Sequence, residues 1–366
     1  MINVMLVASV FIALLVWLTS PQLVKLTAKG FEGEQFNLAV KLIRIGAPVI
    51  LFSSMIGPLT GFLQSEQLHL SSAAIGYPFN IVYLIYLVFF TSKFGIKGLM
   101  VVAVIAVVSQ LLIQLPEARK AGFGFQRVFD IKDIYINKVL CLSGPVLLGV
   151  VVNDIVVIID KTIASDLVIG SISALSYGSR LNSLVSGIFV VAITTVVFPL
   201  LSQASNKGNI KGMKKIMSEG VELILLITIP ASVGVIILAK PVVELAFQRG
   251  AFTANDTLMT SQTLILYSVG LVATSLRRLI TRVYYSLQDT KTPMVNGILS
   301  VGINIIFNFI LVKYMAYRGL AFSNSIASII ATLLLFYGLK KKIGSLGTVN
   351  YIKTGLKSGF VLCLWE

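Results

Sequence analysis

The sequence predicts an all-α membrane protein, a polytopic helical bundle built from two pseudo-symmetric lobes. Of its 366 residues, 56% are hydrophobic and only 12% are charged, and the mean hydropathy is +0.92. Soluble domains carry about 25% charged residues. Ten apolar runs are long enough to cross a bilayer as complete helices. In addition, sequence features of the first part of the chain recur in the second part at a nearly constant offset.

The first part of the chain holds four predicted spanning helices, at 1–19, 38–63, 72–91 and 97–115. A spanning helix needs about 20 mostly apolar residues, and each run comes close to that length. The first run has neither a basic leader nor a small-residue cleavage site, so we interpret it as a spanning helix and not as a signal peptide. These four helices form a predicted partial N-terminal lobe, residues 1–116.

A connector between two halves is predicted at 117–136. It contains Arg119, Lys120, Arg127 and Lys132 and no spanning apolar run. Because loops rich in lysine and arginine stay in the cytoplasm, we expect this connector to be cytoplasmic.

The second part of the chain holds six predicted spanning helices, which form a C-terminal lobe over residues 137–340. They are predicted at 137–160, 171–201, 220–239, 260–284, 293–314 and 319–339. Residues 341–366 are predicted to be a linker and the start of a further helix near Ile352, which is too short to cross a membrane. We therefore expect the chain to be cut at its C-terminus.

Lysine and arginine are distributed unevenly between the predicted loops. Eighteen of the thirty lie in or beside the loops that follow the even-numbered helices, and nine lie beside the opposite loops. By the positive-inside rule the richer side is cytoplasmic, so the N-terminus is predicted on the cytoplasmic face. The net charge of +15 thus follows the membrane topology, and we expect no nucleic acid partner.

An internal repeat is predicted at an offset of about 220–224 residues. Gly46 is followed eighteen residues later by Gln64, and Gly270 is followed eighteen residues later by Gln288. Further pairs with a similar offset are Pro21 to Gly30 with Pro241 to Gly250, Asn80 with Asn304, and Gly98-Leu99 with Gly319-Leu320. Both copies would enter the bilayer in the same direction, as in transporters with parallel repeats. The first two helices of the second copy have no counterpart, so we expect two helices to be missing before Met1.

Arg180 lies inside a predicted span, at 171–201. A centrally placed arginine costs roughly 2.5–3.5 kcal/mol, so such residues face a protein-lined or watery interior. The surrounding polar residues recur every three or four positions and so form one stripe of one helix: Ser173, Ser176, Tyr177, Arg180 and Ser183. We interpret this stripe as a binding surface for an anionic cargo. The alternative is a structural arginine paired with a carboxylate such as Asp154.

A second polar group consists of Asp160, Asn304, Asn308 and Asn324. Asn304 and Asn308 are four residues apart and share a helix face. Oxygen ligands from one carboxylate and several amides suit a sodium ion. The alternative is that these asparagines form hydrogen bonds between helices. We expect no other metal site, because the only histidine is His69 and the two cysteines, Cys141 and Cys363, lie in apolar segments without zinc spacing.

Several stretches together resemble the MurJ (MviN) lipid II flippases of the MOP exporter superfamily. They are Asn153 with Asp160-Lys-Thr-Ile-Ala-Ser165, Gly170-Ser-Ile-Ser-Ala-Leu-Ser-Tyr-Gly-Ser-Arg180-Leu181, Phe198-Pro199, Phe247-Gln-Arg-Gly-Ala-Phe-Thr253, and Tyr285-Ser-Leu-Gln-Asp-Thr-Lys-Thr-Pro293. The resemblance covers nearly all of the chain. It implies a MOP/MATE-like fold in which this chain matches the third to the twelfth helix of the family and a stump of the thirteenth.

The resemblance also has implications for the site. Arg180 matches the cavity arginine of the family's eighth helix, whereas the other essential arginines lie mostly in the first two helices, which have no counterpart here. Related flippases have an ion site that resembles the group around Asp160, although an acidic residue can occupy the position of Asn308. The amide at Asn308 weakens that site.

The resemblance implies a flippase that moves undecaprenyl-pyrophosphate-linked peptidoglycan precursor, lipid II, from the inner to the outer leaflet by alternating access. Guanidinium groups suit the pyrophosphate because they stay charged and bind phosphate oxygens bidentately. We expect a multi-pass, monomeric protein of the bacterial cytoplasmic membrane, surrounded by membrane lipids, with ion or membrane-potential coupling and with sodium as the one candidate coupling ion. No catalytic motif or nucleotide-binding loop is present in the sequence, so we expect no enzyme activity. The alternatives are a flippase for another lipid-linked oligosaccharide and a MATE-like small-molecule antiporter.

Overall fold

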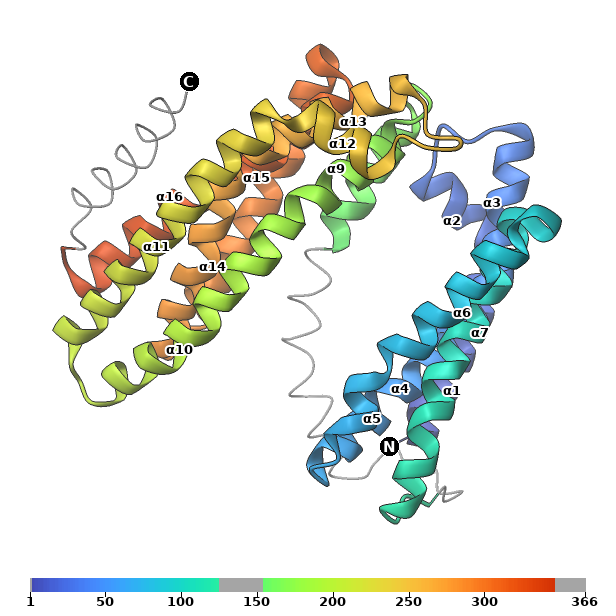
Figure 1. Cartoon of the computed structure of the whole chain (residues 1–366), viewed down its shortest axis with the longest axis horizontal. Helices are drawn as coiled ribbons and strands as arrows, with labels where there is room; N and C mark the ends of the chain where they lie inside the picture. The colour runs from blue at the N-terminus through green and yellow to red at the C-terminus, as the bar shows by residue number, and fades with distance from the viewer. Residues whose placement is uncertain (1, 125–153, 346–366) are drawn as a thin grey trace. The chain divides into compact units, whose positions relative to one another are not determined.

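The computed structural model describes residues 2–124 and 154–345 (Figure 1). Within these ranges the chain is helical apart from short turns, and no strand occurs there. The chain divides into two compact units, Met1–Val146 and Leu147–Glu366.

The described part of the first unit, residues 2–124, contains seven helices. They are α1 (Ile2–Leu18), α2 (Ser20–Thr27), α3 (Gly33–Gly46), α4 (Pro48–Ser65), α5 (His69–Ala74), α6 (Gly76–Phe89) and α7 (Thr91–Lys120). Helix α4 packs against both α1 and α7, and α6 packs against α7. A small core at one end joins α4 to α7 through Leu59, Leu63 and Ala118. Elsewhere large apolar side chains such as Phe11, Val88 and Leu112 are exposed, as expected for surfaces that meet lipid.

Helix α7 continues to Lys120, four residues into the predicted connector 117–136. Pro116 lies inside this helix, although a proline removes one backbone hydrogen bond. Packing of the fully buried Ala118 and a hydrogen bond from Ser71 to Glu117 hold the extra turn. The rest of the predicted connector, from residue 125 to residue 136, lies outside the described residues.

The second unit begins, in its described part, with a helical stretch over residues 154–165. It continues with α9 (Ser171–Val185), the π-helical turn η1 (Ser186–Val190), α10 (Val191–Asn206), α11 (Ile210–Ile237), α12 (Ala239–Phe247), α13 (Ala254–Val269), α14 (Leu271–Ser286), α15 (Lys291–Met315) and α16 (Tyr317–Ile343). The main core of this unit lies between α10, α11, α14 and α16, with Leu201, Met217, Leu279 and Leu335 fully or almost fully buried. Polar groups bind across helices as well: the Tyr284 hydroxyl donates to the Leu335 carbonyl at 2.9 Å.

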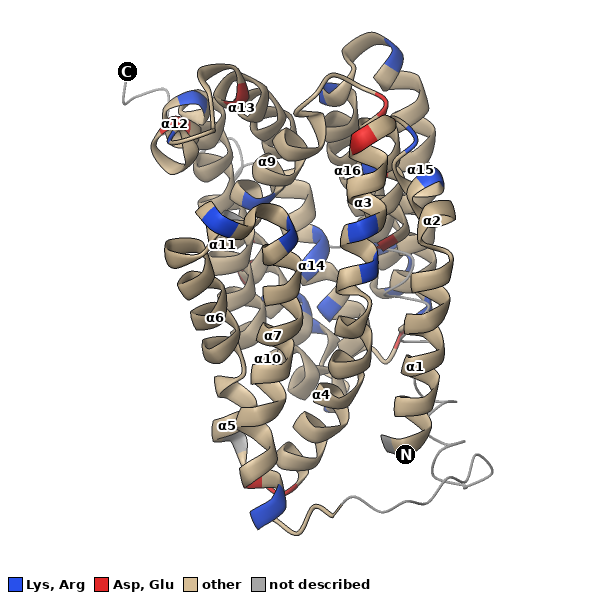
Figure 2. Cartoon of the chain, turned by 90° about the vertical axis from the view of Figure 1, so that its right-hand side faces the viewer, with Lys and Arg blue, Asp and Glu red and all other residues tan. Residues whose placement is uncertain are grey.

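The predicted all-α membrane fold is confirmed. In the described part of the chain, seven helices are long and apolar enough to span a membrane, and two bent helix pairs raise the number to nine. These nine correspond to nine of the ten predicted spans, and the tenth, at 137–160, lies mostly outside the described residues. Helix α1 illustrates the composition, because it has no charged residue (Figure 2).

The predicted repeat also appears in the backbone of the two units. Gln67 and Gln288 both have a φ of 60°, and they are 221 residues apart. Gly95 and Ala316, again 221 residues apart, have φ values of 53° and 48°. The two helices that precede these glutamines end with equivalent backbone hydrogen bonds. Leu68 N donates to Leu63 O at 2.8 Å, and Asp289 N donates to Tyr284 O at 3.0 Å. Residues with positive φ are uncommon outside glycine, so these matched positions support a duplication.

Candidate functional site

Helix α9 carries Arg180 and is held in place by close packing on α13. The packing depends on Gly178, because a Cβ atom there would lie 3.2 Å from the Leu264 backbone nitrogen and closer still to the Thr263 hydroxyl. The Thr263 hydroxyl lies 2.9 Å from the Ala174 carbonyl oxygen of α9 and so links the two helices. The helix starts after Gly170, whose φ of +97° favours glycine.

The predicted polar stripe on α9 lines two pockets. Ser176, Arg180 and Ser183 line one pocket, whereas Ser173 and Tyr177 line another. Successive helical residues are rotated by about 100°, so the five positions cover an arc of roughly 120°. The two edges of so wide an arc face different neighbours, so the five residues are divided between two pockets. Their role in binding cargo stays a prediction.

The Arg180 pocket has a volume of about 460 Å³ and lies between α9, α14 and the helical stretch 154–165. Its wall includes three cationic side chains, Lys161, Arg180 and Arg278, and one carboxylate, Asp160. Arg180 is exposed in the pocket. In the ranges 2–124 and 154–345 it forms no ion pair, with Asp154 or with any other carboxylate. The pocket therefore offers a guanidinium group, flanked by serine hydroxyls, to an anionic group.

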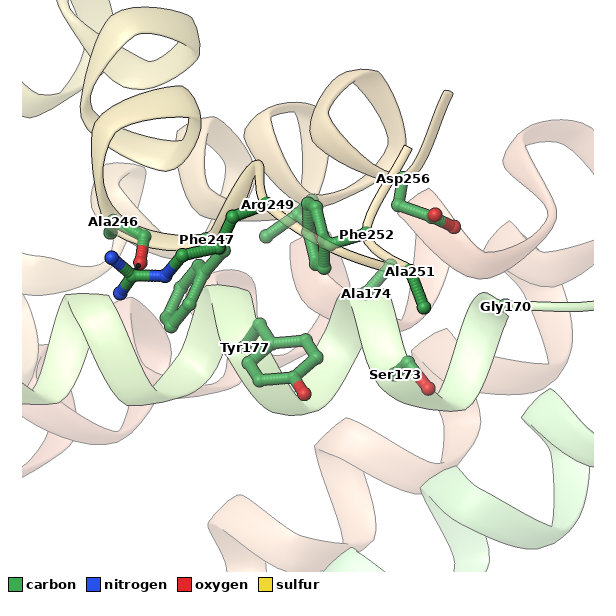
Figure 3. A pocket seen from close by; sticks show the side chains of 11 residues that line it. Gly170, Ser173, Ala174, Tyr177, Ala246, Phe247, Arg249, Ala251, Phe252 and Asp256 are labelled. Atoms are coloured by element: carbon green, nitrogen blue, oxygen red, sulfur yellow. Dashed lines mark hydrogen bonds between the residues drawn. The ribbon is translucent and has the colours of Figure 1, made fainter. Parts of the chain in front are cut away.

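The second pocket contains Tyr177 in an aromatic cluster (Figure 3). The Tyr177 ring centroid lies 4.7 Å from that of Phe247 and 5.6 Å from that of Phe252. Such tilted and edge-to-face pairs stabilise packing. Tyr177 thus fastens the segment between α12 and α13 to α9, and Ser173 lies beside it (Figure 3).

The predicted ion group is partly assembled. The Asn308 amide donates to Asp160 Oδ1 at 2.6 Å and lies 3.1 Å from Asn304 Oδ1. Asn324 does not join this set by a hydrogen bond to it, but it lines the Arg180 pocket together with Asp160. The hydrogen bonds agree with the simpler expectation of bonding between helices. Two buried atoms, Asn308 Oδ1 and Asn304 Nδ2, have no hydrogen-bond partner among the described residues.

Our sequence interpretation missed a second basic groove. Arg277, Arg278 and Arg282 of α14 line a groove of about 880 Å³ between α10 and α14. The count of lysine and arginine assigned these three arginines to a cytoplasmic loop, but they lie within the predicted span 260–284. The argument that singled out Arg180, an arginine inside a spanning segment, applies equally to these three residues and would have found them.

Comparisons with known proteins identify the family of the chain. The model of the family "Lipid II flippase MurJ" matches residues 1–365. A probable lipid II flippase MurJ of Buchnera aphidicola subsp. Baizongia pistaciae is 32% identical over 340 residues, which cover 92% of this chain and 66% of the relative. A probable lipid II flippase MurJ of Vibrio cholerae serotype O1 is 33% identical over 313 residues, with coverage of 85% and 59%. The chain thus spans about three fifths to two thirds of the length of these relatives.

Solved structures give the same result for the fold. A lipid II flippase MurJ in an inward closed conformation superposes with a TM-score of 0.85 at 28% identity, covering 100% of this chain and 76% of that one. An inward-facing multidrug resistance MATE family transporter of the MOP superfamily has a TM-score of 0.76 at 16% identity, with coverage of 94% and 80%. The second likeness concerns the fold alone.

Proposed function

The chain belongs to the lipid II flippase MurJ family, and from this premise we propose that it moves lipid II from the inner to the outer leaflet by alternating access. Its long apolar helices and its family place it in the cytoplasmic membrane of bacteria. The cargo is an undecaprenyl-pyrophosphate-linked disaccharide peptide, so a polar, anionic headgroup has to pass a low-dielectric layer. A flippase therefore needs fixed cations that replace the water around the phosphates.

The observation that carries the proposal is the environment of Arg180. Its guanidinium is exposed in a pocket inside a spanning helix bundle, and it forms no ion pair with any carboxylate that the structure describes. The hydroxyls of Ser176 and Ser183 line the same pocket. A guanidinium group binds phosphate oxygens through two parallel hydrogen bonds, and hydroxyls complete such a site.

The test is outer-leaflet lipid II in cells depleted of their own flippase and supplied with this protein. We expect restored surface lipid II with Arg180 intact and a loss of roughly tenfold or more with Arg180→Ala, because a charge-assisted bond contributes about 1.5–3 kcal/mol. Arg180→Lys should keep part of the activity, since lysine retains the charge but not the planar fork. The matched control is Arg318→Ala, which removes an exposed arginine from the start of α16.

Two results would contradict the proposal. If membrane-inserted protein restores no surface lipid II, the cargo is a different lipid-linked glycan or a small molecule. If Arg180→Ala and Arg180→Lys both transport as well as the unchanged protein, Arg180 does not contact the cargo.

We also propose that Asp160, Asn304 and Asn308 hold a sodium ion. Two observations support this. Asn308 Oδ1 is buried without a partner among the described residues, and Asp160 forms no ion pair there. Carboxylate and amide oxygens are ligands that hard cations accept. Asn324 lines a pocket together with Asp160, and we propose it as a further amide ligand. A bound sodium ion would supply positive charge that offsets the half-buried carboxylate of Asp160.

The sodium proposal is tested by stability and not only by transport. A ligand that binds the folded state raises the melting temperature by mass action. We expect sodium chloride to raise the melting temperature of the purified protein more than potassium chloride at equal ionic strength, and Asp160→Asn to remove the difference. Asp154→Asn, an exposed aspartate on the same helical stretch, is the control. An equal response to the two salts would rule out the site.

A further inference from the structure

The groove between α10 and α14 contains an unusual concentration of positive charge for a spanning segment. Arg277, Arg278 and Arg282 lie in α14, the second half of a bent span. None of them forms an ion pair with a carboxylate in the part of the chain that the structure describes. Each arginine in a bilayer interior costs roughly 2.5–3.5 kcal/mol unless water or an anion compensates it.

The three arginines differ in their surroundings. Arg277 is half-buried and donates to the Ser300 hydroxyl of α15 at 3.1 Å, so it is tied to the protein. Arg282 lies with its guanidinium carbon 5.3 Å from the centre of the Phe198 ring on α10, which holds it against the groove wall. Arg278 and Arg282 are both exposed. Hydroxyl groups from both helices line the same groove: Thr194, Thr195, Thr274, Thr281 and Tyr285.

The groove is continuous with the Arg180 pocket, because Thr274 and Arg278 line both. Helix α9 and the α13–α14 pair begin at the same end of the unit, since the backbone at Gly170 lies beside Asp256 and Met259 (Figure 1). Arg180 is nearer to that end, and Arg282 is nearer to the other end, where α14 terminates at Ser286. The distribution of lysine and arginine predicts that this second end is cytoplasmic.

The spacing of Arg278 and Arg282 favours a ligand with two adjacent negative groups. Residues four apart on a helix have Cβ atoms about 5–6 Å from each other, and two like charges at this spacing destabilise the helix. An anion between them removes the repulsion. Guanidinium groups match phosphate oxygens in geometry. Thr281 and Tyr285, whose hydroxyls form no hydrogen bond among the described residues, supply further donors in the groove. A diphosphate can bind the guanidinium groups of Arg278 and Arg282 at the same time.

We propose that Arg278 and Arg282 form a diphosphate-binding site on the cytoplasmic side of Arg180, where the pyrophosphate of a polyprenyl-linked substrate binds before it reaches the Arg180 pocket. This inference rests on the proposed function and adds a second binding site for the pyrophosphate to it. Arg278 belongs to both cavities and passes the phosphates from one to the other. Arg277, fixed by Ser300, contributes positive charge without binding the ligand.

The test measures binding of a polyprenyl pyrophosphate without sugar or peptide to the purified protein in phosphatidylcholine nanodiscs, by native mass spectrometry. We expect Arg278→Ala and Arg282→Ala each to weaken binding by roughly ten- to a hundredfold, the range expected for loss of a charge-assisted bond. Arg278→Lys should fall between these variants and the unchanged protein. Arg318→Ala should bind like the unchanged protein. Thermal melting and gel-filtration profiles identify any variant that fails to fold. If Arg278→Ala fails to fold, the binding measured for Arg278→Lys tests the proposal.

Two further ligands identify the source of the phosphate. Phosphatidylglycerol should be retained equally by all variants, and lipid II should lose affinity in parallel with the polyprenyl pyrophosphate. If the alanine variants lose lipid II but keep the polyprenyl pyrophosphate, the groove binds the peptide carboxylates, and the proposal is overturned. Equal loss of phosphatidylglycerol would make the groove a general anionic-lipid site and would also overturn it.

Failure of this inference is distinguishable from failure of the proposed function. If the unchanged protein binds lipid II and the Arg278 and Arg282 variants bind both pyrophosphate ligands equally well, only the second site is wrong. If the unchanged protein binds neither pyrophosphate ligand, the proposed function itself is wrong.

Discussion

Charged side chains in this protein are placed in two different ways. Arg180 faces a pocket without a carboxylate partner among the described residues, whereas Asp289, in the turn between α14 and α15, is fully bound. The carboxylate of Asp289 accepts from the Lys342 ammonium at 2.7 Å and from the Thr292 backbone N–H at 2.9 Å. The first arrangement leaves a charge for a ligand, and the second uses a charge to join helix ends.

The ion pair between Asp289 and Lys342 predicts that the stability of the folded protein depends on pH. Burial opposes its ionisation, but the hydrogen bonds from Lys342 and Thr292 prevail and lower the pKa of Asp289 from 3.8 to about 2. A group whose pKa is lower in the folded state stabilises the fold above its unfolded pKa, so this contribution is full above about pH 4 and is lost between pH 4 and pH 2. Lys342 is 42% exposed, and solvent screening limits the contribution to about 1 kcal/mol.

The measurement is thermal melting of purified protein between pH 2 and pH 7. Lys342→Gln should lower the melting temperature at pH 7 and reduce the loss between pH 4 and pH 2. Lys340→Gln, a change in the same last turn of α16, should do neither. A Lys342→Gln protein that melts like the unchanged protein at every pH would show that the ion pair does not contribute.

At the level of single residues, Arg180 could be singled out from the sequence because the cost of an arginine in a bilayer is large and local, and its side chain lines a pocket. The same sequence did not predict that Tyr177 packs on Phe247 and Phe252. Phe247 and Phe252 lie some seventy residues further along the chain, and they reach Tyr177 only because of the way in which α12 and the following segment fold. Periodicity assigns a residue to a helix face, but the identity of the neighbour at that face depends on tertiary packing.

Helix packing around the site depends on a glycine. Gly178→Ala places a methyl group 3.2 Å from the Leu264 backbone nitrogen and closer to the Thr263 hydroxyl, so α9 and α13 must move apart. We expect a loss of about 1–3 kcal/mol of stability, the usual cost of overpacking, and a lower melting temperature. The matched control is Gly234→Ala in α11, where no atom lies within 4 Å of the added Cβ. There the better helix propensity of alanine should leave stability equal or higher.

The opposite result at Gly178 would be informative. If Gly178→Ala melts at the same temperature as the unchanged protein, the close approach of α9 to α13 does not hold the Arg180 helix, and its position must depend on other contacts.

The elements themselves were largely predictable, because ten long apolar runs leave few alternatives to spanning helices. The breaks within the predicted helices were not predictable from the sequence. The span predicted at 260–284 bends by 45° between α13 and α14, and a π-helical turn at Ser186–Val190 interrupts the predicted helix 171–201. Hydropathy measures length and polarity only. Breaks depend on local packing, such as the contact of Gly270 with Ser325, where an added Cβ would lie 2.7 Å from the serine Cα.

For the whole molecule, the internal repeat is the sequence feature that returns most clearly in the structure. The offset seen in the sequence returns as matched backbone geometry at Gln67 and Gln288. The candidate site was less predictable. Asp160 and Asn308 meet across 148 residues, and the α14 groove needs α10 for its second wall. Such sites arise from several helices, whereas sequence patterns describe one helix at a time.

The most direct measurement of the central claim is lipid II translocation by the purified protein in liposomes that contain no other protein. Lipid II is placed in one leaflet, and its appearance in the other is followed with a membrane-impermeant reagent that modifies the headgroup. Our account predicts exchange well above that of empty liposomes, strongly reduced by Arg180→Ala and unaffected by Arg318→Ala. Exchange at the rate of empty liposomes with correctly folded protein, or exchange that is equal in Arg180→Ala, would contradict it.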